Sequence, residues 1–337
     1  MTPDERHPTN PEGGGMPASE EVRKGIWALA QPMPGGHLAY SLTYLLRGDD
    51  GGIHVIDPGW DSDANWARLE SVLRELAPHS GGVRAVTGIT GTHLHPDHVG
   101  LAARLRAASG AAFALHGVER QVLEEHSTRL LDPDEALGRL EGWGVPETRR
   151  PDLLRFVDRS PEGLAVAVDH DLADGDTLAV QGRRIEVLAT PGHTAGHICL
   201  RDDDHEVLLT GDHVLPTVFA GLGLGGTTAS NPLADYIESV ERLEPYGDYE
   251  ALPGHGHRFR GLGDRARACR DHHLARTRDV GAILEETAPG SEAPPIWDIA
   301  SRLTWTAGWD GLQGLHLLSA LSQTAMHVDF LRSGPVR

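Results

Sequence analysis

The stretch GTHLHPDHVG, residues 91–100, gathers His93, His95, Asp97 and His98 into one short polar segment. With 20 histidines in 337 residues, chance is a poor explanation for such a cluster. Pro96 and the uneven spacing do not fit one helix face, whereas an extended backbone lets alternate side chains project the same way. The strand-like run VRAVTGIT leads directly into the cluster. We therefore expect these side chains in a loop at the end of a strand.

The residue types in this cluster point to a metal. Neutral imidazoles and a carboxylate suit a divalent cation of borderline softness, typically zinc. One short loop cannot saturate such an ion, and three later positions supply further candidates: His193 in TPGHTAGH, Asp212 in LLTGDH and His255 in LPGHGH. Each follows a strand-like run and has a glycine beside it, which lets the backbone approach closely. The sequence thus predicts a metal centre assembled from several loops.

Two regions of the chain have the alternating pattern of β-strands. Residues 41–48 and 52–59 flank the turn-forming GDDGG and predict a hairpin. Strand signals return over residues 177–193 and 197–213, with QG and RDDD as turns.

Segments with helical periodicity lie between and after these predicted strands. Residues 63–77 place apolar side chains on one stripe, and Asn231 followed by Pro232 predicts the start of another helix. Short helical segments over about residues 118–169 indicate an inserted helical region, and residues 263–337 predict a helical C-terminal region.

Composition restricts the class of protein. The formal net charge of −19 disfavours a nucleic-acid partner, and no apolar run is long enough to cross a membrane. The two cysteines, Cys199 and Cys269, lie far apart, which is typical of the reducing cytoplasm. Residues 1–22 are rich in Pro, Gly and charge, and predict a disordered leader. We expect a cytoplasmic protein.

The order THLHPDH, GH, GD, PGHG resembles the metallo-β-lactamase superfamily from about Ile26 to Phe259. The resemblance implies an α/β fold, an αβ/βα sandwich of two facing sheets with helices outside and a metal cleft at one edge. The catalytic domain would then span residues 23–262. The segments DHHLARTRDVGAILEE and IWDIASRLTW resemble the winged-helix-like tail of a subgroup that contains endoribonucleases and acyl-carrier-protein (ACP) thioesterases.

The resemblance also implies a ligand set for two divalent metal ions, with zinc expected and manganese or iron as alternatives. The first ion would be held by His93, His95 and His193. The second would be held by Asp97, His98 and His255, with Asp212 bridging the two ions. Asp57 in VIDPG matches an acidic residue that supports the metal loops, as a partner to an imidazole N–H.

This ligand set implies hydrolysis by a hydroxide that bridges the metals, with Asp97 orienting it and passing a proton to the leaving group. The apolar VLPTVFAGLGLGG after Asp212 favours a thioester, lactone or related acyl substrate, free or carrier-bound. The alternatives are a metal-dependent endoribonuclease or phosphodiesterase, an iron-dependent persulfide dioxygenase and a non-catalytic metal-binding module. The inserted helices either cap the cleft and expose Trp143 to it, or serve packing or a homodimer contact.

Overall fold

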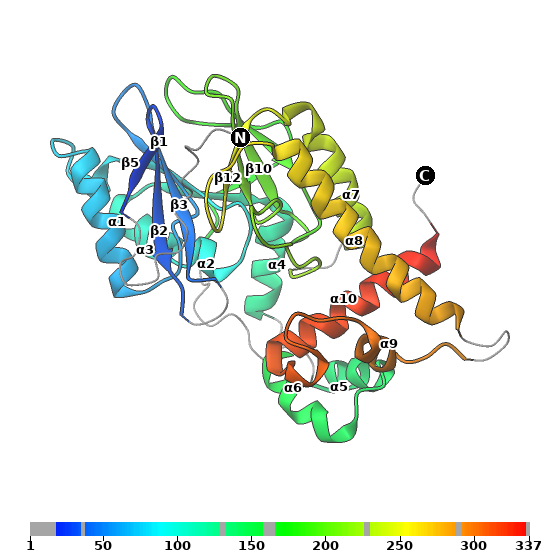
Figure 1. Cartoon of the computed structure of the whole chain (residues 1–337). Helices are drawn as coiled ribbons and strands as arrows, with labels where there is room; N and C mark the ends of the chain where they lie inside the picture. The colour runs from blue at the N-terminus through cyan, green and yellow to red at the C-terminus, as the bar shows by residue number, and fades with distance from the viewer. Residues whose placement is uncertain are drawn as a thin grey trace.

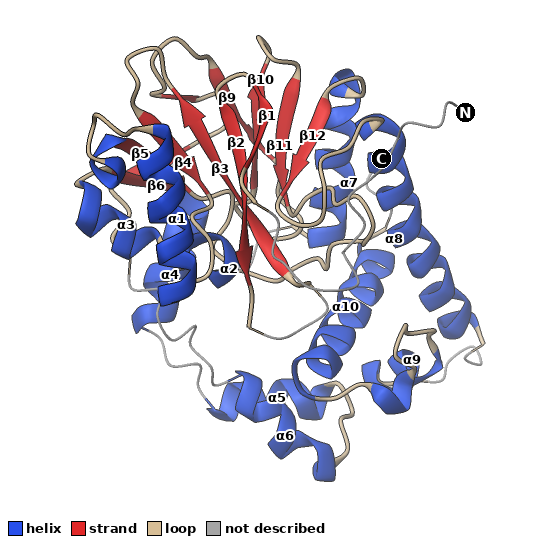
Figure 2. Ribbon diagram, turned by 60° about the vertical axis from the view of Figure 1, so that its left-hand side comes forward, coloured by secondary structure: helices blue, strands red, loops and turns tan. Residues whose placement is uncertain are grey.

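Two β-sheets lie face to face, with helices on both outer sides (Figure 1; Figure 2). A computed structural model describes residues 18–34, 38–128, 133–157, 166–225, 230–286 and 292–334. The first sheet follows chain order: β1 (Glu20–Arg23), β2 (Ile26–Pro32), β3 (Tyr40–Arg47), β4 (Ile53–Ile56), β5 (Val86–Thr90), β6 (Ala112–His116) and β7 (His170–Leu172). The second sheet has the order β12 (Glu250–Pro253), β11 (Val207–Gly211), β10 (Ile198–Asp202), β9 (Ile185–Ala189) and β8 (Thr177–Leu178).

The alternation of side chains along the strands explains why the sheets stack. In β3, Tyr44 and Leu46 pack between the sheets, whereas Leu45 packs against the outer helices. In β10, Leu200 lies between the sheets and Cys199 faces the helices of the other side. Both faces of each sheet are thus buried, because successive side chains point to opposite faces.

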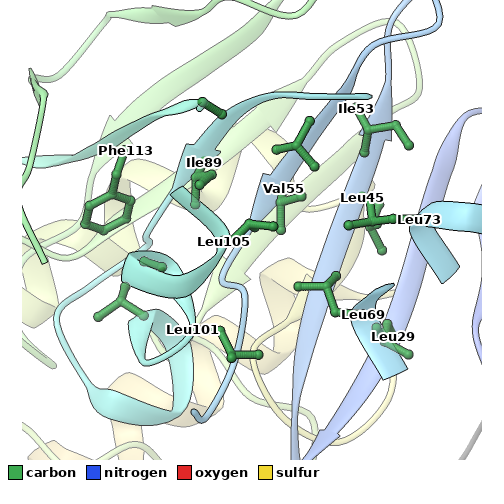
Figure 3. Close-up of a cluster of buried hydrophobic side chains, with 14 of the residues drawn as sticks. Leu29, Leu45, Ile53, Val55, Leu69, Leu73, Ile89, Leu101, Leu105 and Phe113 are labelled. Carbon is green, nitrogen blue, oxygen red and sulfur yellow. The ribbon is translucent and has the colours of Figure 1, made fainter. Parts of the chain in front are cut away.

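Helices cover each sheet on its outer side. The first sheet is covered by α1 (Asp63–Leu76), α2 (Pro96–Val99), α3 (Ala102–Ser109) and α4 (Gly117–Thr128). Figure 3 shows Leu69 and Leu73 of α1 near Leu45, and Leu105 of α3 beside Val55. The second sheet is covered by α7 (Pro232–Leu243) and α8 (Leu262–Glu285).

The inserted helices pack on the C-terminal helices rather than on the sheets. The inserted pair is α5 (Pro133–Gly142) and α6 (Arg150–Val157), and the C-terminal pair is α9 (Ile296–Arg302) and α10 (Gly314–Ser333). The four helices lie together at one end of the molecule (Figure 1). Trp143 packs in their shared apolar cluster, and its carbonyl accepts a hydrogen bond from Trp297 N at 2.9 Å. The structure therefore gives Trp143 a packing role.

Most of the predicted elements are present. The hairpin of β3 and β4 is antiparallel, and so are the pairs β8–β9 and β10–β11. Asn231 caps α7, its side chain accepting a hydrogen bond from Leu233 N at 2.9 Å. The described residues of 292–334 contain two α-helices and a 3₁₀ turn, and no strand. No helix in the described residues is long and apolar enough to span a membrane.

Two local expectations were wrong. The leader was expected to reach residue 22, but Glu20–Arg23 form β1, which pairs antiparallel with β2; residues 1–17 lie outside the described residues. Val22 is buried between the sheets, which stabilises this strand. Residues 83–85, expected in a strand, belong to a 3₁₀ turn at Gly82–Ala85.

Candidate metal centre

The predicted ligands meet at one edge of the sandwich. The segment 91–98 follows β5, Asp212 follows β11 and His255 follows β12, while His193 lies in the turn between β9 and β10. Asp97 and His98 lie in the first turn of the short helix α2, which begins at Pro96, and not in a loop as expected. The helix starts there because proline is well suited to the first helical position. Loops that are far apart in the sequence lie next to one another here, because the strand ends that carry them lie at the same edge of the sandwich.

Three imidazoles form the first group of converging donors, His93, His95 and His193. His95 Nδ1 lies 2.9 Å from His93 Nε2 and 3.2 Å from His193 Nε2. Ligands about 2.0 Å from a tetrahedral zinc ion would be about 3.3 Å apart, which is close to these separations.

Asp97, His98 and His255 form the second group. His255 Nε2 lies 3.3 Å from His98 Nε2 and 3.2 Å from Asp97 Oδ2. Asp212 stands between the two groups, with its carboxylate 3.3 Å from His255 Nε2 and 3.7 Å from His193 Nε2. All seven predicted side chains are thus brought together, and Asp212 is placed to reach both groups.

The outer nitrogen of each imidazole is held by a hydrogen-bond acceptor. His193 Nδ1 donates to Gly221 O at 2.7 Å, and His95 Nε2 donates to Leu224 O at 2.8 Å. Because a carbonyl can only accept, the outer nitrogen carries the proton and the inner one of the neutral ring has a free lone pair.

The second group is held in the same way. His255 Nδ1 donates to Tyr40 O at 2.9 Å, and His98 Nδ1 donates to Asp57 Oδ2 at 2.9 Å. This confirms the expected partnership of Asp57 with an imidazole N–H. These contacts fix the tautomer and the ring orientation, as is usual around protein-bound metals.

The electrostatics of the centre favour an added positive charge. Burial lowers the pKa of His193 to about 4 and holds that of His93 well below its usual value, so both rings are neutral. Burial also acts against charge on His255, but the nearby Asp212 outweighs it and raises the pKa of His255 to about 10. The pKa of His98 is raised against burial in the same way, by Asp212, Asp97 and Asp57. Carboxylates therefore hold protons on these two rings when no cation is bound.

The donor set fits a divalent cation. Asp212 Oδ1 is buried and makes no hydrogen bond, although a buried carboxylate oxygen normally has a partner. The centre offers five imidazole nitrogens and the carboxylates of Asp97 and Asp212. Zinc, manganese and iron all accept such ligands. The backbone beside them must lie close, because a Cβ on Gly254 would be only 2.4 Å from Asp212 Oδ1.

Glu119 was not identified from the sequence, and it joins two of the site loops. This side chain at the start of α4 is fully buried and accepts hydrogen bonds from Leu94 N at 2.8 Å and Gly196 N at 2.6 Å. Burial raises the pKa of Glu119. Glu119 lies on the same helix face as the buried Val122 and Leu123, and this spacing could have revealed it in the sequence. An acid on an apolar helix face needs buried hydrogen-bond partners.

Of the remaining histidines, His197 supports the centre most directly. Its Nε2 accepts a hydrogen bond from Asp212 N at 3.1 Å, and its Nδ1 lies 2.9 Å from Thr190 Oγ1. His197 therefore supports the backbone at Asp212. Both ring nitrogens of the buried His213 lack a hydrogen-bond partner.

The family model described as the metallo-beta-lactamase superfamily matches residues 38–255. The chain belongs to the metallo-β-lactamase superfamily. Superfamily members and thioesterase relatives of this chain are hydrolases, and the typical superfamily member binds divalent metals at such His and Asp groups.

Two of the relatives are thioesterases by name. The acyl-coenzyme A thioesterase MBLAC2 of Gallus gallus is 28% identical over 232 residues, 64% of this chain and 72% of that protein. The atrochrysone carboxyl ACP thioesterase of Aspergillus fumigatus is 28% identical over 140 residues, 42% of this chain and 40% of that protein. The chain thus spans less than half the length of some curated relatives that it matches, 37% for the beta-lactamase-like protein 2 homolog of Caenorhabditis elegans.

A solved structure resembles the whole chain. The metallo-beta-lactamase family protein TTHA1429 from Thermus thermophilus has a TM-score of 0.74 and 28% sequence identity. The match covers 93% of this chain and 94% of that protein, so the likeness includes the helices outside the sandwich.

Proposed function

We propose that this enzyme hydrolyses an acyl substrate, a thioester first and a lactone second, at a centre of two divalent metal ions, with zinc as the resident metal. The observation that carries the proposal is the convergence of five imidazoles and two carboxylates at one edge of the sheets. The two thioesterase relatives support an acyl substrate, free or carrier-bound.

The ligand assignment follows the two groups of donors. The first ion would be held by His93, His95 and His193, and the second by Asp97, His98 and His255. Asp212 is shared, because its Oδ2 lies 3.7 Å from His193 Nε2 of the first group and 3.3 Å from His255 Nε2 of the second. When bound, such ions lower the pKa of water and polarise an acyl oxygen.

Asp97 is the carboxylate best placed to act on the reacting atoms. Its side chain is 15% exposed, against 10% for Asp212 and 3% for Asp57. Although burial acts to raise the pKa of Asp97, the charge of His98 and the hydrogen bond from His255 lower it, so the carboxylate is ionised. Its oxygen can therefore accept a hydrogen bond from the attacking water, orient it, and carry a proton to the leaving group.

A chelation and substrate experiment tests this proposal. Purified enzyme is assayed with an acyl-CoA, a lactone, a β-lactam and RNA, before and after dialysis against a chelator. We expect thioester hydrolysis that disappears on chelation and returns with zinc. We expect His193→Ala to lose it as well, whereas the exposed His79 gives a matched control, His79→Ala, that retains it. Thioester turnover that survives complete metal removal, or cleavage of RNA alone, would contradict the proposal.

A further inference from the structure

The segment after β11, residues 215–225, is joined to the metal centre through its backbone; we call it the lip loop. Gly221 O and Leu224 O are the two carbonyls that orient His193 and His95. A molecule bound at the first group of imidazoles therefore lies close to this loop.

The lip loop is fixed against the neighbouring segment 192–195 by main-chain hydrogen bonds. Gly223 N donates to Gly192 O and Leu224 N donates to His193 O, both at 2.8 Å, and Ala195 N donates to Gly225 O at 3.0 Å. Gly223 has φ +67°, a left-handed conformation that favours glycine. The polar backbone groups of this half of the loop are thus used in holding the loop in place.

The other half of the lip loop is anchored on α8. Arg265 donates to Leu215 O at 2.7 Å and to Val218 O at 2.6 Å. The Phe219 ring stacks on the His272 ring at 3.8 Å, and the guanidinium of Arg265 lies 4.5 Å from the Phe219 ring centre. The loop is therefore preformed, which reduces the entropy lost when a ligand binds.

The side chains that this fixed loop presents to solvent are apolar. Val218 is 38% exposed, Phe219 40% and Leu224 38%. In the described part of the chain six large hydrophobic side chains are exposed, and these three share one loop beside the metal centre. Grouped exposed apolar side chains typically mark a binding surface, because burying them in a complex is favourable.

We propose that the lip loop is the acyl-binding subsite and takes a hydrophobic acyl chain. Leu224, whose carbonyl holds His95, contacts the carbons nearest the reacting group, and Phe219, held on α8, contacts carbons farther along the chain. The guanidinium of Arg265 donates its hydrogen bonds to the loop carbonyls of Leu215 and Val218 rather than to a ligand. This surface therefore suits an acyl chain better than a phosphate. This inference rests on the proposed acyl hydrolysis.

The test compares acyl chain lengths in Leu224→Ala, Phe219→Ala and the wild type. We measure kcat/KM for thioesters of four, eight and twelve carbons, and the affinity of the matching free carboxylates by titration calorimetry. Each loop variant should lower the preference for the longest over the shortest chain about tenfold, since truncation removes most of a leucine or phenylalanine contact. Leu331→Ala is the matched control, because Leu331 on α10 is also 38% exposed, and it should leave the preference unchanged.

The two measurements separate the inference from the proposed function. If the wild type hydrolyses thioesters but the loop variants keep its chain-length preference, the subsite is overturned and the proposed function stands. If no acyl compound is hydrolysed, the proposed function fails and calorimetry decides the subsite. Carboxylate affinity that rises with length in the wild type but not in the variants then supports the subsite, and affinity independent of length overturns it.

Discussion

Asp57 gives the sharpest test of how the protein prepares its histidines. The residue is buried, and its Oδ2 accepts from His98 Nδ1 at 2.9 Å and from Thr92 Oγ1 at 2.7 Å, while Oδ1 accepts from Thr92 N at 2.7 Å. Its backbone has φ +49°, which asparagine and aspartate adopt more readily than other non-glycine residues. Asp57→Asn therefore changes the hydrogen bonding with little backbone strain.

The size of the effect follows from these contacts. If the amide oxygen keeps the bond from Thr92 N, the new NH₂ group faces His98 Nδ1, and two donors cannot pair. The neutral form of His98, which a metal needs, would then carry its proton on Nε2, the nitrogen that faces the second group of ligands. We expect zinc affinity to fall about 10- to 100-fold. We expect the metal-free protein to lose about 1–3 kcal/mol of stability through the mismatched buried groups.

The assay is competition for zinc against a chromophoric chelator, with urea unfolding of the metal-free protein beside it. Asp202→Asn is the matched control, because Asp202 is fully buried but lies at the far end of β10 from His197. It pairs with Arg183 at 3.1 Å, so its substitution should lower stability without lowering zinc affinity. Equal zinc affinities for the Asp57→Asn and Asp202→Asn proteins would refute the tautomer argument.

Three further outcomes are expected. Asp212→Asn and His95→Ala should each abolish turnover while circular dichroism shows a largely intact fold, and wild-type turnover in either variant would reject the shared centre. Glu119→Gln should cost about 1–3 kcal/mol in urea unfolding, because the new NH₂ group faces a main-chain N–H in the interior; an unchanged midpoint would exclude that contact. Burial lowers the pKa of His54 to about 4 and of His273 to about 3, from an ordinary value of 6.5. As the pH falls, these two histidines therefore take up protons in the unfolded chain before they do so in the folded protein. The stability that the two neutral rings contribute is fully present above pH 6.5 and falls toward pH 4, by up to about 1.4 kcal/mol per pH unit for each ring. Urea unfolding at pH 7, 6 and 5 measures this slope, and a flat profile would be inconsistent with neutral buried rings.

Much of the site could be predicted because its residue types are unusual and its loops are short. The cluster from His93 to His98 stands at a strand end in a pattern that no helix face or chance grouping explains. His193, Asp212 and His255 follow strand-like runs next to glycines, and the sandwich brings these ends to one edge. Local patterns sufficed because each ligand lies within a few residues of a strand.

The rest depends on contacts between distant residues. Glu119 joins Leu94 N to Gly196 N, two groups separated by about a hundred residues of chain, and nothing local records that pairing. Gly221 and Leu224 orient two imidazoles through their backbone carbonyls. Every residue type has a carbonyl, so the sequence gives no sign of these contacts. The docking of α5 and α6 on α10 likewise depends on apolar faces whose partner the sequence does not name.

The central claim is that seven side chains hold two cations at one edge of the sheets. Anomalous diffraction from zinc-soaked crystals, recorded on both sides of the zinc absorption edge, tests it most directly. We predict two peaks in each molecule, one beside His93, His95 and His193, the other beside Asp97, His98 and His255, with Asp212 between them. A single peak, or peaks away from these side chains, would contradict the account.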